Sequence, residues 1–113
     1  MFDVERLGTL SILAMPPRLA VTHVRGFIEG VQEELRNGAR RVALDLRETE
    51  TIDMTALAAI VEMYKQSANR GVELRLSAPR ESVRRLFSIT RLDRVLPIDE
   101  LMESEDELAA AAE

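Results

Sequence analysis

One hydroxyl and one carboxylate, those of Thr55 and Asp53, form the pair best suited to regulated chemistry. They lie two residues apart in the run 51–58, Thr-Ile-Asp-Met-Thr-Ala-Leu-Ala. The Asp53 carboxylate can accept hydrogen bonds from the free N–H groups at the start of a helix. Thr55 would then fall in the first turn, where the helix dipole tolerates the roughly −1.5 to −2 charge of an added phosphoryl group. Two interpretations remain open: a reversible switch at Thr55, or an ordinary first-turn threonine in a capped helix.

The residues on either side of this run predict a strand followed by a helix. Residues 42–46, Val-Ala-Leu-Asp-Leu, alternate apolar with small or polar side chains, which is typical of a strand with one covered face. Asp53 therefore stands where a helix at about 54–69 is expected to begin. The apolar stripe of this helix consists of Leu57, Ile60, Val61, Tyr64 and Ala68.

The same reasoning predicts alternating strands and helices along the chain. Two strands, 2–6 and 9–15, flank a turn at Leu7 and Gly8, and Pro16 and Pro17 end the second strand because neither can donate to a β-ladder. The other expected elements are a helix at 20–37, a strand at 41–46, a loop at 47–52, a strand at 72–76 and a strand near 94–98. Between the last two strands a further helix is expected, with Pro79 in its first turn and Val83, Leu86 and Phe87 on its buried stripe.

Strands separated by helices imply parallel pairing through right-handed crossovers, whereas the N-terminal hairpin must be antiparallel. The predicted fold class is therefore α/β, with a mixed, mostly parallel sheet. Because the strands alternate rather than being apolar throughout, we expect the helices to pack mainly on one face. Residues 1–113 are predicted to form a single small domain that closes with an acidic helix at about 99–113.

Charge is distributed unevenly along the chain. Residues 99–113 hold seven acidic residues and no lysine or arginine, whereas the preceding 98 residues carry 13 acidic and 15 basic residues. Five arginines gather between residues 80 and 94, but Glu81 and Asp93 interrupt them and Phe87 is the one aromatic residue among them. A solvated helix face explains this pattern better than a stacking platform does, so no nucleic-acid partner is predicted.

Residue types that catalysis or metal binding usually needs are sparse. The chain has no cysteine and one histidine, His23, so a second histidine or a thiolate cannot complete a metal site or a catalytic pair. A glycine-rich phosphate loop is also absent. An acidic rim around Thr55 could hold a cation or consist of loop charges beside the helix cap; it comprises Asp45, Glu48, Glu50 and Asp53. The protein is predicted to be no enzyme and to bind neither cofactor nor metal.

No apolar run approaches the roughly 18 residues that a membrane span needs. The first residues also lack the apolar core of a signal peptide. We therefore expect a cytoplasmic protein without direct membrane insertion. A homodimer remains open, through a free sheet edge or an exposed sheet face.

With these elements in place, the chain resembles the STAS domain family, the fold of bacterial anti-sigma factor antagonists. The strand 42–46, a six-residue loop and the run 53–58 are similar to the family's apolar strand, its short loop and a helix start close to Asp-Ser-Ser-Gly-Leu-Gly. Residues 64–71, 77–87 and 101–111 resemble three later features: a helix end with a glycine turn, a strand exit into the next helix, and an acidic closing helix. The similarity extends over nearly the whole chain.

The resemblance implies a partner switch at Thr55, which matches the family's phosphorylated serine, while Asp53 matches the aspartate two residues before it. Unphosphorylated antagonists of the family bind an anti-sigma factor and thereby free the sigma factor. The implied partner is an anti-sigma factor that is also a serine kinase of the GHKL type, and a phosphatase resets the cycle. The expected partner-binding residues are Asp53, Met54, Thr55, Ala56, Leu57 and Ala59.

Several positions depart from the family pattern. Met54 replaces a hydroxyl residue, alanines at 56 and 58 replace glycines, and Arg91 stands where a glycine is common. The acidic residue common after the second strand is missing from residues 17–20, Pro-Arg-Leu-Ala. Two other functions therefore remain open: a soluble adaptor of a lipid or anion transport system, in which Thr55 is not phosphorylated, and a sensor of a nucleotide or another small ligand.

Overall fold

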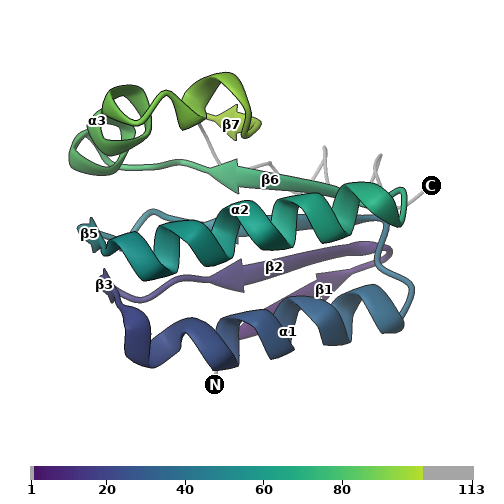
Figure 1. The fold of residues 1–113 in the computed structure, drawn as a ribbon. Coiled ribbons are helices and arrows are strands. Elements are labelled where there is room, and N and C mark those ends of the chain that lie inside the picture. The colour runs from purple at the N-terminus through teal and green to yellow at the C-terminus, as the bar shows by residue number, and fades with distance from the viewer. Residues whose placement is uncertain (1, 101–113) are drawn as a thin grey trace.

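Strands and helices alternate in the computed structural model, which describes residues 2–100 (Figure 1). Five strands form one sheet in the order β1-β2-β4-β6-β7, in which β1 is antiparallel to β2 and the remaining neighbours are parallel. The predicted α/β fold with a mixed, mostly parallel sheet is confirmed. The strands are β1 Val4–Leu7, β2 Leu10–Ala14, β4 Arg41–Asp45, β6 Glu73–Ser77 and β7 Ile98–Asp99.

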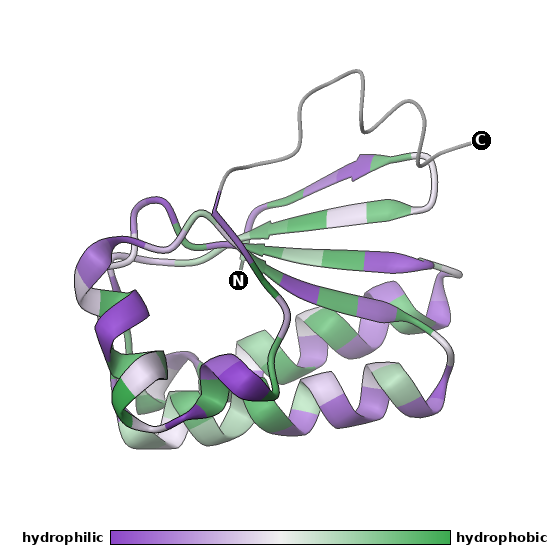
Figure 2. Cartoon of the chain, turned by 90° about the horizontal axis from the view of Figure 1, so that it is seen from above, coloured by the Kyte–Doolittle hydropathy of each residue, from purple (hydrophilic) through white to green (hydrophobic). Residues whose placement is uncertain are grey.

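Leucine side chains from three neighbouring strands meet at the centre of the sheet. The parallel register places Leu13 beside Leu44 and Leu44 beside Leu76, and all three are 0% exposed. Helices α1 (Val24–Arg36) and α2 (Met54–Asn69) pack over this face, and Figure 2 shows both on the same side of the sheet. The strand alternation therefore predicted correctly that the helices lie mainly on one face.

A buried glutamate fastens α1 to the β1–β2 hairpin. The carboxylate of Glu34, which is 2% exposed, accepts hydrogen bonds from Ser11 Oγ at 2.7 Å and from Arg6 Nε and Nη2 at 2.8 and 2.7 Å. The Arg6 hydrogen bonds, helped by that of Ser11, hold the pKa of Glu34 below its usual value although burial acts in the opposite direction. The glutamate is therefore ionised at neutral pH and links helix to sheet.

The third helix, α3, spans Glu81–Ile89 and begins later than expected. Pro79 was predicted in its first turn, but Arg80 is the N-cap and Pro79 precedes it. The buried stripe is confirmed for Val83 and Phe87, which are 1% and 0% exposed. Arg91, which follows the C-cap of this helix, has a left-handed backbone with φ 61°. A glycine would adopt that conformation without strain, whereas the Cβ atom of Arg91 makes it unfavourable.

The last described segment also differs from the prediction. A 3-10 turn, η2 (Leu92–Arg94), occupies the start of the expected strand at 94–98, and β7 begins only at Ile98. Asp99, expected to open the closing helix, is the last residue of β7, and its Oδ1 lies 2.7 Å from Arg75 Nη2 of β6. Glu100, also part of the predicted acidic helix, forms a bend, and the rest of that helix, residues 101–113, lies outside the described residues.

Candidate functional site

Two very short strands, β3 (Arg18–Leu19) and β5 (Thr51–Ile52), position the start of α2. They pair in parallel, with Leu19 beside Ile52. The sequence analysis missed both strands because two residues are too few for a periodic pattern. Their pairing brings two segments about 30 residues apart side by side, so that the 3-10 turn η1 (Val21–His23), which leads into α1, lies next to the start of α2 (Figure 1).

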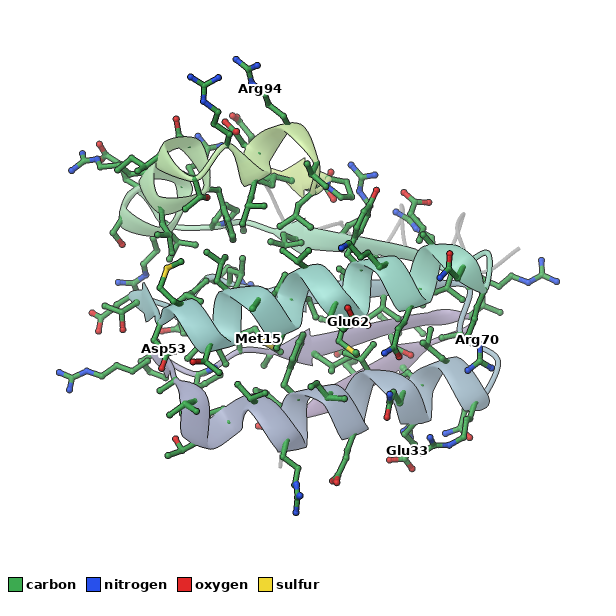
Figure 3. All side chains as sticks on the ribbon, viewed as in Figure 1. Met15, Glu33, Asp53, Glu62, Arg70 and Arg94 are labelled. Carbon is green, nitrogen blue, oxygen red and sulfur yellow. The ribbon has the colours of Figure 1, made fainter. Side chains whose placement is uncertain are left out.

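Asp53 is the N-cap of α2, as the sequence predicted. Its Oδ1 accepts from the backbone N–H of Ala56 at 2.8 Å, and its carbonyl accepts the first helical hydrogen bond from Leu57 at 2.9 Å. Its second carboxylate oxygen, Oδ2, accepts from the backbone N–H of Val21 at 2.8 Å. Asp53, labelled in Figure 3, thus links the 3-10 turn η1, which leads into α1, to the start of α2.

The first turn of α2 presents Met54 and Thr55 to the outside. Met54 is 68% exposed, and Thr55 is also exposed. Val21, whose N–H is held by Asp53, is 57% exposed. The exposed Thr55 therefore follows one large exposed apolar residue, Met54, in the chain, and a second one, Val21, is bonded through its N–H to the N-cap of the same helix.

Three of the residues predicted to contact a partner are buried. Ala56, Leu57 and Ala59 are 2%, 3% and 5% exposed and belong to the main hydrophobic core. Their side chains support the helix from below and do not reach its outer surface. Of the predicted contact set, Met54 and Thr55 are exposed and Asp53 is partly exposed. The exposed position of the next turn is Ala58.

The loop between β4 and β5 is braced from both sides. Thr49, 0% exposed, donates its hydroxyl to the carbonyl of Pro16 at 3.0 Å. On the other side, Ser82 Oγ donates to the carbonyl of Glu50 at 3.0 Å, and Arg80 Nε donates to the carbonyl of Arg47 at 2.8 Å. Sequence reasoning missed these contacts, and Arg80 was assigned to a solvated helix face. The local signal was an uncharged residue, Thr49, between the charged residues Glu48 and Glu50.

The acidic rim expected around Thr55 is divided among three sets of partners: Arg47, Arg80 and the backbone N–H groups that Asp53 caps. Asp45 lies 2.9 Å from Arg47 Nη2, and the Asp45 hydrogen bonds raise the pKa of Arg47. Glu48 and Glu50 lie 3.8 and 3.7 Å from Arg80, while Asp53 accepts backbone N–H groups. Within residues 2–100 no three His, Cys, Asp or Glu side chains are grouped so that they could hold a metal ion. The rim therefore acts as a set of local ion pairs and one helix cap.

His23 belongs to an open hollow of about 530 Å³ between the N-terminus, the Pro16–Pro17 turn and η1. Its Nδ1 accepts from the Ala20 N–H at 3.1 Å, and its ring lies edge-on to Phe2 with centroids 6.3 Å apart. Thr55 does not line this hollow. The histidine stabilises the entry into α1.

Comparisons with known proteins place these features in a family context. Residues 1–107 match the model of the STAS domain. A Thermotoga maritima protein, named as a candidate anti-sigma factor antagonist, is 31% identical over 110 residues, which is 96% of this chain and 97% of that protein. None of the described helices is long and apolar enough to cross a membrane.

Solved structures agree with this match. The crystal structure of a Thermotoga maritima protein, also named as a candidate anti-sigma factor antagonist, superposes with a TM-score of 0.80 at 29% identity and covers 98% of this chain and 93% of that one. The phosphorylated form of the Bacillus cell fate determinant SpoIIAA gives a TM-score of 0.72 over the whole of both chains. At 10% identity, the second similarity shows a common fold and no more.

Proposed function

The chain belongs to the STAS domain family, and we propose that it is an anti-sigma factor antagonist: a protein-binding regulator controlled at Thr55. The observation that carries the proposal is the exposed Thr55 hydroxyl in the first turn of α2, beside the exposed Met54 side chain. The names of the Thermotoga relatives support the same function. The regulator acts by binding and release, without catalysing a reaction of its own.

The proposed partner is an anti-sigma factor that doubles as a serine kinase of the GHKL type. Its contact surface meets the start of α2, where the accessible groups are Met54, Thr55 and the edge of Asp53. Ala56 and Leu57 take part indirectly, because their burial fixes the orientation of the first turn. Without a phosphoryl group the exposed first turn presents the apolar Met54 and the neutral Thr55 and has no charge apart from the capping carboxylate, which favours a closely packed interface.

Phosphorylation of Thr55 would release this partner. The phosphoryl group brings about −1.5 to −2 charge into the contact surface, and burying it without a matching cation is costly. A loss of roughly 3 kcal/mol lowers affinity more than a hundredfold. A phosphatase that removes the group restores binding. The SpoIIAA structure in a phosphorylated form supports phosphorylation as a state that this fold accommodates.

The proposal is tested with Thr55→Glu and its uncharged isostere Thr55→Gln. We would purify each GHKL-type anti-sigma factor kinase of the source organism and measure binding to the wild-type chain and to both variants by calorimetry. One kinase should bind the wild-type protein and Thr55→Gln with similar affinity and Thr55→Glu at least tenfold more weakly. Equal binding of both variants, or no binding kinase at all, would contradict the proposal.

Phosphorylation of Thr55 is measured directly on the native protein. Intact-mass spectrometry of material from stressed and unstressed cells should show an adduct of about 80 Da, mapped to Thr55, whose amount changes with conditions. A protein that carries no adduct under any condition would instead favour the adaptor of a transport system, in which Thr55 is an unmodified contact residue.

A further inference from the structure

Asp53 uses its two carboxylate oxygens for two different segments. Oδ1 accepts the N–H of Ala56, which belongs to the same helix, at 2.8 Å. Oδ2 accepts the N–H of Val21, which lies 32 residues earlier, also at 2.8 Å. An N-cap needs only the first of these bonds. The second bond is an additional feature that ties the entry of α1 to the start of α2.

The segment that Asp53 holds contributes to the outer surface. Val21 and Met54 are two of the four large apolar side chains that are strongly exposed among residues 2–100; the other two, Ile89 and Val95, belong to the region of α3 and η2. A further hydrogen bond, from the Asp53 N–H to the Leu19 carbonyl at 3.0 Å, aligns the same two segments. Val21 is thus bonded through its N–H to the Asp53 carboxylate, and Met54 is the next residue after Asp53 in the chain.

We infer that Asp53 is a positioning residue: its carboxylate holds Val21 beside the start of α2 so that both segments form one contact surface, and a phosphoryl group on Thr55 loosens this link. The inference rests on the proposed function and adds its regulation. Phosphorylation then does more than place a charge in the interface, because it also releases the segment that carries the exposed Val21 side chain.

The Asp53 carboxylate and a phosphoryl group on Thr55 would lie close together, because the two residues are only two positions apart. Asp53 is the N-cap and Thr55 is the second residue of the helix, so both side chains lie at the first turn. Both anions are attracted to the same small group of free N–H donors at the helix start, and like charges at such short range repel each other. Oδ2 is the oxygen that can move most easily, since its bond to Val21 is exposed whereas the bond to Ala56 is partly buried.

The link is tested by amide hydrogen exchange of the ¹⁵N-labelled full chain, read at Val21 and Ala56. Asp53→Asn is the first variant, because asparagine is an equally good N-cap but can present only one acceptor oxygen. The Ala56 amide should stay protected, whereas the Val21 amide should exchange about tenfold faster. If Val21 exchange is unchanged in Asp53→Asn, the carboxylate does not hold this segment and the inference is overturned.

The second arm uses protein with phosphothreonine incorporated at position 55 during synthesis, so that no kinase is needed. Val21 exchange should again rise about tenfold, while Thr55→Val, which has nearly the same shape but no hydroxyl, should match the wild type. A phosphoryl group that pairs instead with the exposed Arg18 would leave Val21 protected, and that result would also overturn the inference.

The two exchange experiments can fail or succeed independently of the tests of the proposed function. If native protein carries no phosphate and no kinase binds, the proposed function fails, yet Asp53→Asn and the phosphothreonine protein still report on the link between the two segments. Conversely, if Thr55→Glu abolishes kinase binding while Val21 exchange stays slow in the phosphothreonine protein, the function stands and the release of Val21 is wrong.

Discussion

The hydroxyl of Ser82 donates a hydrogen bond to the carbonyl of Glu50 at 3.0 Å, which joins the first turn of α3 to the loop that leads into α2. Glu50 in turn donates its N–H to the carbonyl of Pro17 at 2.7 Å. The loop is therefore held between α3 on one side and the segment before α1 on the other. The position of Thr55 depends on these contacts, although none of them touches the threonine itself.

Ser82→Ala should lower the free energy of unfolding by about 1 kcal/mol, the usual net value of one hydrogen bond. The Glu50 carbonyl is accessible to water, which limits the loss, but the loop should become more mobile. Urea denaturation measures the stability, and amide exchange of residues 50–53 measures the mobility. Ser88→Ala is the control, because Ser88 is exposed on the same helix and should change neither quantity.

Met54→Glu should weaken binding of the anti-sigma factor kinase by about 2 kcal/mol or more, since it replaces an exposed apolar contact with a charge at the centre of the proposed surface. Ile89→Glu is the matched control: Ile89 is 74% exposed but belongs to α3. Calorimetry measures the affinity of both variants for the same kinase, and only Met54→Glu should bind more weakly than the wild type. Equal losses in the two variants would show that the contact surface is not centred on the start of α2.

Glu34→Gln should change the pH dependence of stability. Because the Arg6 hydrogen bonds lower the pKa of folded Glu34, its stabilising effect is complete above the pKa of an unfolded glutamate and is lost as pH falls through the lower, folded value. At neutral pH the variant should be less stable by roughly 1 kcal/mol. This difference from the wild type should shrink as the pH falls below about 4.

The measurement is urea denaturation of both proteins at a series of pH values between neutral and strongly acidic. Glu33→Gln serves as the control because Glu33 is exposed on the same helix and accepts no hydrogen bond from Ser11. At neutral pH its difference from the wild type should be much smaller, because the change leaves the Ser11 and Arg6 hydrogen bonds of Glu34 in place. A constant difference for Glu34→Gln would contradict the role given to the Arg6 contact.

Arg91→Gly should stabilise the protein, although glycine usually destabilises. The backbone of Arg91 is left-handed, with φ 61° and ψ 17°. This conformation raises the free energy of a residue with a Cβ atom by about 1 kcal/mol, whereas glycine adopts it without that cost. Arg94→Gly is the control, since Arg94 ends a right-handed 3-10 turn and should lose stability on the same change. The midpoint temperature of thermal denaturation should rise for Arg91→Gly and fall for Arg94→Gly.

Local sequence patterns were sufficient to predict most of the regular structure. The helix expected at about 54–69 is α2, Met54–Asn69, because a capping aspartate and a long apolar stripe are both properties of neighbouring residues. The same holds for the β1–β2 hairpin, where Gly8 has φ 63°. The acidic helix and the single-domain prediction for residues 1–113 stay predictions.

The capping role of Asp53 could be read from the chain because Ala56 is three residues away. Its bond to Val21 and the bracing of the loop by Thr49 and Ser82 could not, because these contacts join residues 32 or 33 positions apart. Such pairs form only when folding brings distant segments together, and the entropy lost in closing the intervening chain depends on the whole fold. The chemistry available at Thr55 thus followed from the order of its neighbours, whereas the surface around it depends on how distant segments pack.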